Sequence, residues 1–272
     1  MTSTRIGLNL AALGIVACAL ASCASPGAPA PAVAPPPASG VPDYQLGDAY
    51  PPDDRVRIVG RDRSAEPADG LYSICYVNGF QTQPDERDEW PDELLLRTAA
   101  GEPVIDPDWP DEVILDTSTT AKRRSIADIV GPWIEGCAAS GFQAVEFDNL
   151  DTFTRTDGAL ALDDNLSLAA TLVDVAHGAG LAAGQKNAAE YAADLHDAAG
   201  FDFAVTEECA AYDECASYTD VYGSAVIDIE YSDALPRTFD EMCADPGSPS
   251  SMVLRDRRLS APGDPDHVFA VC

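Results

Sequence analysis

The sequence predicts an α/β fold, and within that class a single (β/α)8 barrel of the TIM type, from three observations. Segments rich in β-branched and aromatic residues alternate with stretches of helical periodicity, a pattern that indicates a parallel sheet. Eight such segments follow one another in the chain, which favours a closed barrel. The chain has 272 residues, and a barrel of this type usually occupies about 250 as one domain.

The predicted strands are short, and Gly, Asp or Pro bounds each of them. In chain order they cover residues 44–46, 56–59, 72–77, 144–148, 181–186, 201–205, 225–231 and 251–254. The sequence contains neither a GxGxxG motif nor a P-loop motif, which weakens the case for a nucleotide-binding sheet.

Three stretches between these strands have helical periodicity, and they cover residues 125–140, 166–179 and 188–199. Pro132 is expected to kink the first helix or to start a second one. Asp163 or Asp164 is expected to cap the second helix at its beginning. Gly180 and Gly200 stand where the last two helices should end.

Residues 81–120 are acidic and lack clear periodicity, so we expect an elaborated loop region above the barrel. Long insertions in barrels usually build the face that binds the substrate. Trp90 and Trp109 lie in this region. They are candidates for stacking on sugar rings, with aromatic packing as the alternative.

The N-terminus has the features of an export signal. Arg5 precedes an apolar run, residues 6–20, that is too short to span a bilayer comfortably. The end of this run resembles a bacterial lipobox, so residues 1–22 are predicted to be a signal peptide and Cys23 to carry lipid. Residues 23–42 are then an Ala- and Pro-rich tether, and residues 43–272 form the barrel domain. The expected location is outside the cytoplasm, anchored to the cell membrane, with plain secretion as the alternative.

Six cysteines remain if Cys18 leaves with the signal and Cys23 carries lipid. An even number of cysteines in an exported chain predicts disulfides. Cys209 and Cys215 are close enough in sequence to pair in a small loop. The pairing of the other four is left open; these are Cys75, Cys137, Cys243 and Cys272. A zinc site is the rival interpretation, but the spacing lacks paired CxxC motifs, so no metal site is predicted.

The formal net charge of the chain is −30. Nucleic acid is excluded as a partner, because binding phosphates requires a basic surface. A cationic polymer would be attracted to such a chain, and the alternative is that the acidity only maintains solubility. No cofactor is expected, and we expect a monomer.

Carboxylates gather at the predicted carboxyl ends of the strands, where barrel enzymes place their active sites. Alternation along strand 144–148 puts Glu146 and Asp148 on one face, and Asp228 and Glu230 likewise share a face of theirs. Acids that converge raise one another's pKa, and glycosidases use one carboxyl as an acid while another stays ionised. The acids and the lysine at these ends are Glu146, Asp148, Lys186, Glu207, Asp228 and Glu230.

Other chemistries have less support in the sequence. No GxSxG motif is present, which argues against a serine hydrolase. His177 lies near a helix end, where capping or packing explains it better than catalysis. A divalent metal held by Glu146, Asp148 and Glu230 is the remaining alternative, since oxygen ligands suit Ca²⁺ or Mg²⁺, but no metal-binding loop motif accompanies them.

Two longer runs in these segments resemble glycoside hydrolase family 114, the endo-α-1,4-polygalactosaminidases. Residues 141–151, GFQAVEFDNLD, resemble the family pattern GxDxVExDNxD. Residues 201–215, FDFAVTEECAAYDEC, resemble the pattern FDFAVNEQCxxYxEC. The resemblance extends from about residue 44 to residue 254. Shorter matches are Cys75-Tyr76, residues 176–181, residues 185–187 and Glu230-Tyr231.

The resemblance implies a barrel that hydrolyses α-1,4 bonds in galactosamine-rich polysaccharide. Carried over by position, Asp148 would be the nucleophile and Glu207 the acid/base of a retaining mechanism. A disulfide between Cys209 and Cys215 is implied as well. The expected partner is a cationic or partly acetylated galactosamine polysaccharide, which fits the acidic composition. The residues expected to contact it or to tune the catalytic pair are Tyr76, Glu146, Asn149, Asp151, Lys186, Asp228 and Glu230.

The sequence departs from the family pattern at positions expected to line the pocket. Phe147, Gln185, Thr206 and Glu208 stand where the family usually has Pro, Leu, Asn and Gln. Asn78-Gly79 replaces the usual run of small residues after the third strand. These changes bear on the identity of the substrate more than on the catalytic pair. The rival function is a non-catalytic, glycan-binding surface lipoprotein on the same barrel.

Overall fold

The computed structural model describes residues 1–2, 33–84 and 86–272 of the chain. The predicted signal peptide and the lipidated Cys23 fall outside the described residues, apart from residues 1 and 2. Among the helices of the described part, none is both long enough and apolar enough to cross a membrane.

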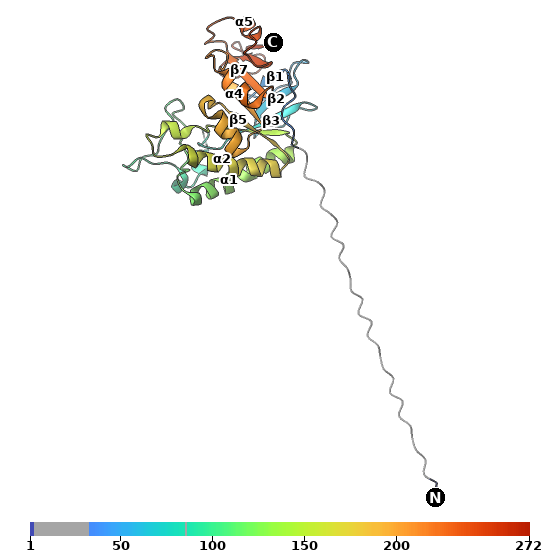
Figure 1. The fold of residues 1–272 in the computed structure, drawn as a ribbon, viewed down its shortest axis with the longest axis vertical. Coiled ribbons are helices and arrows are strands. Elements are labelled where there is room, and N and C mark those ends of the chain that lie inside the picture. The colour runs from blue at the N-terminus through green and yellow to red at the C-terminus, as the bar shows by residue number, and fades with distance from the viewer. Residues whose placement is uncertain (3–32, 85) are drawn as a thin grey trace.

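Eight parallel strands follow one another around a barrel in the order of the sequence, which confirms the predicted fold class (Figure 1). A short ninth strand, β9 (Phe269–Val271), pairs antiparallel with the eighth and was not predicted. The eight are β1 (Pro42–Tyr44), β2 (Ile58–Asp62), β3 (Tyr72–Asn78), β4 (Ala144–Asp148), β5 (Ala182–Lys186), β6 (Phe203–Glu207), β7 (Val226–Tyr231) and β8 (Ser251–Arg255).

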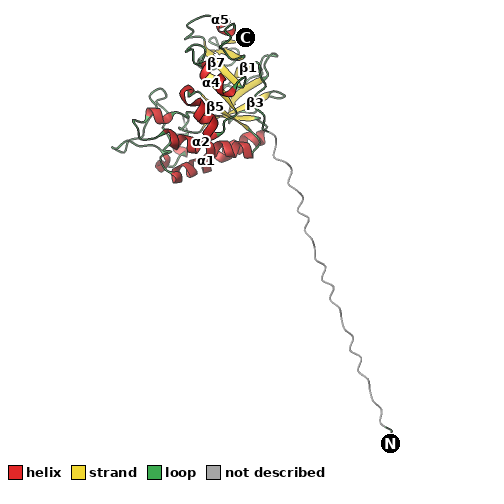
Figure 2. Cartoon of the chain, in the orientation of Figure 1, coloured by secondary structure: helices red, strands yellow, loops and turns green. Residues whose placement is uncertain are grey.

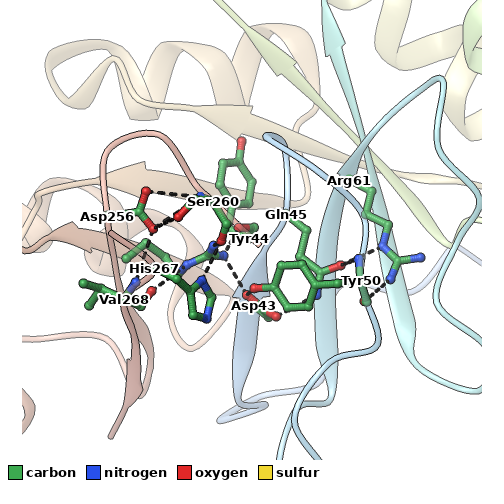
Figure 3. A network of polar contacts seen from close by, with 10 residues as sticks. Asp43, Tyr44, Gln45, Tyr50, Arg61, Asp256, Ser260, His267 and Val268 are labelled. Carbon is green, nitrogen blue, oxygen red and sulfur yellow. Dashed lines mark hydrogen bonds and ion pairs between the residues drawn. The ribbon is translucent and has the colours of Figure 1, made fainter. Parts of the chain in front are cut away.

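A buried ion pair joins the last barrel strand to the first. Arg255, at the end of β8, donates a hydrogen bond of 2.8 Å to the Asp43 carboxylate of β1. The same guanidinium donates to the backbone carbonyl of Tyr44, and its Nε donates to the Val268 carbonyl at 3.0 Å. Figure 3 shows the polar network that surrounds Asp43 and Tyr44. These contacts bring β8 back to β1 and so complete the ring.

Two long helices, α1 (Thr120–Ser140) and α2 (Leu162–Gly178), lie side by side and cover the outside of the strands (Figures 1 and 2). The helix α1 starts before the predicted boundary, because the Thr119 side chain accepts a hydrogen bond from the Lys122 amide. It runs through Pro132 as one element, without a second start. The helix α2 also starts before its predicted boundary, so its N-cap residue is Ala161, and Asp164 in the first turn accepts from the Ala161 amide at 3.1 Å.

The third predicted helix, residues 188–199, is instead three short helical turns: η4 (Ala189–Tyr191), α3 (Ala192–Asp194) and η5 (Leu195–Ala199). Two further short helices follow, α4 (Cys215–Tyr222) and α5 (Phe239–Cys243). Gly200 ends the three turns with a φ of 87°, a left-handed conformation that a glycine adopts without strain.

Residues 81–120 form the predicted elaborated loop region between β3 and α1. It contains two 3₁₀ turns, η1 (Arg87–Glu89) and η2 (Asp92–Leu94), and isolated antiparallel bridges such as Ile105 to Val113. Trp90 is 5% exposed and meets Trp133 edge to face, so this tryptophan packs rather than lining a cleft. Trp109 is 60% exposed.

The strands divide the core in two. Outward-facing residues such as Val145 and Phe147 pack under the helices, while alternate positions face the barrel interior. The lower interior is apolar, and Gly184 leaves room there for the Phe203 ring, since a Cβ on Gly184 would lie 2.5 Å from that ring. The polar residues stand above this layer, at the carboxyl ends of the strands.

Three disulfides tie the outer elements together. Cys209 is bonded to Cys215, and the cysteines whose pairing was left open form Cys75–Cys137 and Cys243–Cys272. The bond from Cys75 links β3 to α1, and the bond from Cys272 links the C-terminus to α5. Disulfides are typical of proteins that fold in an oxidising compartment.

Candidate active site

A buried lysine gathers the acidic side chains at the mouth of the barrel. Lys186 ends β5, points inward and is 3% exposed. Its Nζ lies 3.3 Å from Glu207 Oε2, 3.6 Å from Asp148 Oδ2 and 3.9 Å from Glu146 Oε1. The strands β4 and β6, which carry the acids, pair with β5 on either side. Acids distant in sequence therefore meet around one ammonium group.

The Asp148 carboxylate is held in one orientation and remains open to solvent. Tyr76 donates a hydrogen bond of 2.9 Å to its Oδ2, and the Asn149 amide donates one of 2.7 Å to its Oδ1. Asn149 has a φ of 62°, so the chain turns sharply directly after the strand. The Asp148 side chain keeps 18% of its surface exposed, which leaves it accessible to a ligand.

Glu207 is held by a second set of partners. Tyr231 donates to its Oε1, and Asn187 Nδ2 donates to its Oε2 at 2.8 Å. Asn187 Oδ1 also accepts from the Glu207 amide at 2.8 Å, so one side chain fixes both the strand end and the carboxylate. The Glu207 side chain is 28% exposed.

The pKa values of these acids differ because their surroundings differ. Burial raises the pKa of Glu207, but the Lys186 ammonium and the donors Tyr231 and Asn187 outweigh burial and hold this pKa below its usual value. Burial raises the pKa of Glu146 to about 7, against the opposing effects of Lys186 and Tyr44. The surroundings therefore favour the ionised form of Glu207 and make Glu146 hold its proton to a higher pH than Glu207 does.

Lys186 stays charged despite its burial. Burial lowers its pKa, but the charges of Asp148, Glu207 and Glu146 reverse this and raise the pKa well above its usual value. Tyr44 lies beneath, where it donates to Glu146 and accepts from Lys186 Nζ at 3.1 Å.

Replacing Lys186 with Met is expected to lower the free energy of unfolding at pH 7 by about 3 kcal/mol, because it leaves buried carboxylates without their cation. The lowered pKa of Glu207 contributes stability above the usual Glu pKa, and that contribution is lost as the pH falls through the folded-state value. The difference between the wild type and Lys186→Met should therefore shrink towards pH 3. Urea unfolding across this pH range measures it.

Lys122→Met is the matched control, since Lys122 pairs with Asp116 near the surface. Lys122→Met should lower the free energy of unfolding by less than about 1 kcal/mol. If both variants lowered the free energy of unfolding equally, the Lys186 ammonium would not stabilise the buried acids. A decrease for Lys186→Met that is the same at pH 3 and pH 7 would contradict this role as well.

Two predicted contact residues, Asp228 and Glu230, do not join this group. They share a face of β7, as the alternation predicted, but that face is the outer one. Asp228 Oδ1 accepts from the Thr206 hydroxyl at 2.7 Å and from the Cys209 amide at 3.1 Å. Glu230 Oε1 accepts from the amides of residues 210–211. The structure places both acids where they hold the turn after β6, away from Lys186.

The inner face of β7 explains this outcome. Ile227 and Ile229 fill the barrel interior, and Tyr231 follows them at the mouth. Glu230 therefore lies apart from Glu146 and Asp148, and these three side chains do not form the metal site that the sequence left as an alternative. Among the described residues, one group of side chains has metal-ligand spacing, Cys209, Cys215 and Asp228, but the two sulfurs are bonded to each other.

Asp228→Asn is expected to stabilise the protein by about 1–3 kcal/mol at pH 7. Burial, and then the charge of Glu230, raise the pKa of Asp228 well above its usual value. The folded state consequently binds a proton that the unfolded chain releases, and stability falls as the pH rises from about 4. The asparagine keeps the shape without that cost, so the gain should vanish near pH 4 in urea unfolding.

Asp174→Asn removes an exposed carboxylate on α2 and serves as the control for the change in net charge. A gain in stability for Asp228→Asn that is the same at pH 4 and pH 7, or no larger than the control, would refute this account of the buried pair.

The remaining predicted residues lie at the rim. Asn149 Oδ1 accepts from Arg155 Nη2 at 3.3 Å, and Asp151 pairs with Arg155 at 2.8 Å. Arg155 also pairs with Asp106 at 2.8 Å, which joins the loop region 81–120 to the segment after β4. Asp151 thus belongs to an ion-pair network that shapes the rim.

Sequence reasoning missed several residues that contact the acids around Lys186. Tyr44, Asn187 and Tyr231 hold Glu146 or Glu207, and their strands were predicted without a role for these side chains. The available signal was the alternation itself, because Tyr231 follows Ile227 and Ile229 on one face. Glu112 reaches the rim from the loop region, and no periodicity in the sequence indicates this.

The geometry suits hydrolysis of a glycosidic bond. Two oriented and accessible carboxylates stand at the carboxyl ends of barrel strands, around a fixed positive charge. A pair of carboxylates of this kind supplies the nucleophile or base and the acid that such a bond requires. The fold and the site define a glycoside hydrolase.

The chain belongs to glycoside-hydrolase family GH114, whose sequence model matches residues 23–272. Among solved structures, Ega3 of Aspergillus fumigatus in complex with galactosamine is similar with a TM-score of 0.69 and 22% identity, over 87% of this chain and 96% of that one. The glycoside hydrolase domain of PelA from Pseudomonas aeruginosa gives a TM-score of 0.55 and 14% identity, over 85% of this chain and 99% of that one. No curated protein matches the sequence. The resemblance to the family is thereby confirmed.

Proposed function

We propose that the protein hydrolyses α-1,4 bonds in galactosamine-rich polysaccharide by a retaining mechanism, with Asp148 as nucleophile and Glu207 as acid/base. The observation that carries this proposal is the convergence of the two carboxylates on Lys186, at 3.6 and 3.3 Å. Retention requires carboxyl groups about 5–5.5 Å apart, whereas inversion requires about 6.5–9.5 Å. A gap spanned by one ammonium group favours the shorter separation.

In the first step an Asp148 oxygen attacks the anomeric carbon and forms a glycosyl ester. The bond to the leaving sugar breaks, and Glu207 gives its proton to the departing oxygen. In the second step Glu207 takes a proton from water, the water oxygen attacks the same carbon, and the ester bond breaks to release Asp148. Tyr76 holds the nucleophile throughout, and Tyr231 and Asn187 hold the acid/base.

The electrostatics fit a change of role for Glu207 between the two steps. A bound sugar excludes water from the Glu207 side chain and so raises its pKa towards the protonated form that an acid needs. Once Asp148 is an ester, its negative charge is gone, and the Lys186 ammonium acts more strongly on Glu207. The pKa of Glu207 then falls, as a base requires.

The proposed substrate is a cationic or partly acetylated galactosamine polysaccharide. Ega3, which is similar in fold and contains galactosamine in its structure, supports this substrate class. The match to family GH114 and the net charge of −30 are consistent with it, because an acidic protein attracts a cationic polymer.

The location proposed for the protein is the outer side of the cell membrane. Residues 1–22 would direct export, lipid on Cys23 would anchor the chain, and residues 23–42 would act as the tether to the barrel. Three disulfides support an oxidising compartment. We expect the barrel to act as a monomer.

Incubation with de-acetylated galactosaminan, followed by measurement of new reducing ends, tests the proposed function. Appearance of reducing ends in the wild type supports hydrolysis. Binding without new reducing ends would favour the rival, a non-catalytic glycan-binding lipoprotein. Loss of activity in the presence of a chelator would instead indicate a metal-dependent hydrolase.

A further inference from the structure

One carboxylate at the rim has no role in the proposed reaction. Glu112 stands in the loop region 81–120 and is 8% exposed. Its Oε2 accepts hydrogen bonds from Asn78 Nδ2 at 3.1 Å and from Gln81 Nε2 at 2.6 Å. Within residues 33–84 and 86–272, no hydrogen bond reaches its Oε1, and no ion pair joins Glu112 to a basic side chain. The carboxylate is thus fixed through one oxygen, and the other oxygen has no protein partner.

The partner Asn78 places Glu112 beside the nucleophile. Asn78 ends β3 and lies opposite Asp148 in the register of β3 and β4. Asn78 stands two residues after Tyr76 on the same face of the strand, and Tyr76 donates to Asp148. Glu112 therefore lies at the carboxyl end of β3, beside the end of β4 that carries Asp148.

The charges around Glu112 fit a ligand that is a cation. Burial and, to a smaller extent, the neighbouring charge of Asp148 outweigh the hydrogen bonds from Gln81 and Asn78 and raise the pKa of Glu112 to about 7. A positive group placed against Glu112 would stabilise its ionised form. Lys186, by contrast, already has carboxylate partners on β4 and β6 and would repel a second cation.

We propose that Glu112 binds the ammonium group on C2 of the galactosamine ring whose anomeric carbon faces Asp148, and that it thereby selects rings without an acetyl group. This inference rests on the proposed function. C2 is bonded directly to the anomeric carbon, so its substituent lies close to the attacked atom. An ammonium group can form a charge-assisted hydrogen bond with the open Oε1. An acetamido group offers Glu112 no charge and brings added bulk to a side chain that is almost fully buried.

The test compares the wild type with Glu112→Gln on two oligosaccharides of equal length, one fully de-acetylated and one fully N-acetylated. The ratio of kcat/KM for the de-acetylated over the N-acetylated substrate is expected to fall about 10-fold or more in Glu112→Gln, as expected for losing a charged hydrogen bond. Glutamine can still accept from Asn78 and Gln81, so the loop should keep its position. Glu93→Gln, an exposed change in the same region with the same loss of charge, should leave the ratio unaltered.

An equal decrease on both substrates would overturn the proposal, because it would indicate a structural role. An unchanged ratio would overturn it as well. Calorimetric titration of the de-acetylated oligosaccharide into Asp148→Asn, with and without Glu112→Gln, separates this inference from the proposed function. If the wild type cleaves nothing, but the oligosaccharide binds tightly and Glu112→Gln weakens that binding, the ammonium site would be supported and the proposed hydrolase activity would be contradicted. Binding unaffected by Glu112→Gln would refute the ammonium site.

Discussion

Asp148→Asn is expected to lower kcat on de-acetylated galactosaminan by about 10³-fold or more, with little change in stability. The asparagine has the same shape, its Oδ1 can still accept from the Asn149 amide, and its Nδ2, in place of Oδ2, can donate to the Tyr76 hydroxyl oxygen. Its neutral amide is a poor nucleophile, so the glycosyl ester does not form. Counting reducing ends over time gives kcat, and urea unfolding verifies the fold.

The control for this variant is Asp174→Asn, which removes an exposed carboxylate from α2 and should keep near-normal turnover. If Asp148→Asn also turned over at close to the wild-type rate, Asp148 would not be the nucleophile. The retaining mechanism would then lose its first step, whatever the substrate.

Glu207→Ala is expected to lower the rate on the polysaccharide by about 10²–10⁴-fold, the usual contribution of general acid–base catalysis. Its decisive test uses an oligosaccharide of galactosamine with an α-fluoride at the reducing end. Fluoride leaves without a proton, so Asp148 can still form the ester. Azide, which needs no base, should then attack the ester carbon and accelerate turnover.

The product of that reaction identifies the mechanism. Two displacements at the anomeric carbon give an α-azide, which nuclear magnetic resonance distinguishes from the β-azide of a single displacement. Formation of the β-azide would contradict retention, and turnover indifferent to azide would contradict the role of Glu207. Glu208→Gln changes the next carboxylate, which pairs with Arg257 at 3.0 Å, and this variant should not respond to azide.

The acids of β4 and β7 show that alternation along a strand predicts which side chains share a face, but not which face points into the barrel. For β4 the alternation predicted that Glu146 and Asp148 share a face, and in the structure the alternate residues Val145 and Phe147 pack under the helices. For β7 the same rule placed Asp228 and Glu230 together, but it did not say which face is the inner one. That choice depends on register with the neighbouring strands, which the sequence of one strand does not contain.

The sequence by itself determined the barrel, its eight strands, the elaborated loop and the family, because these depend on local patterns and on motifs of adjacent residues. Only the tertiary structure decided which side chains meet. Asn78, which lies opposite Asp148 in the register of β3 and β4, binds Glu112, and Tyr231 joins β7 to Glu207, through contacts between segments distant in the chain. The disulfides Cys75–Cys137 and Cys243–Cys272 were undecided for the same reason. Closing the ring of strands fixes distances between residues that no local pattern relates.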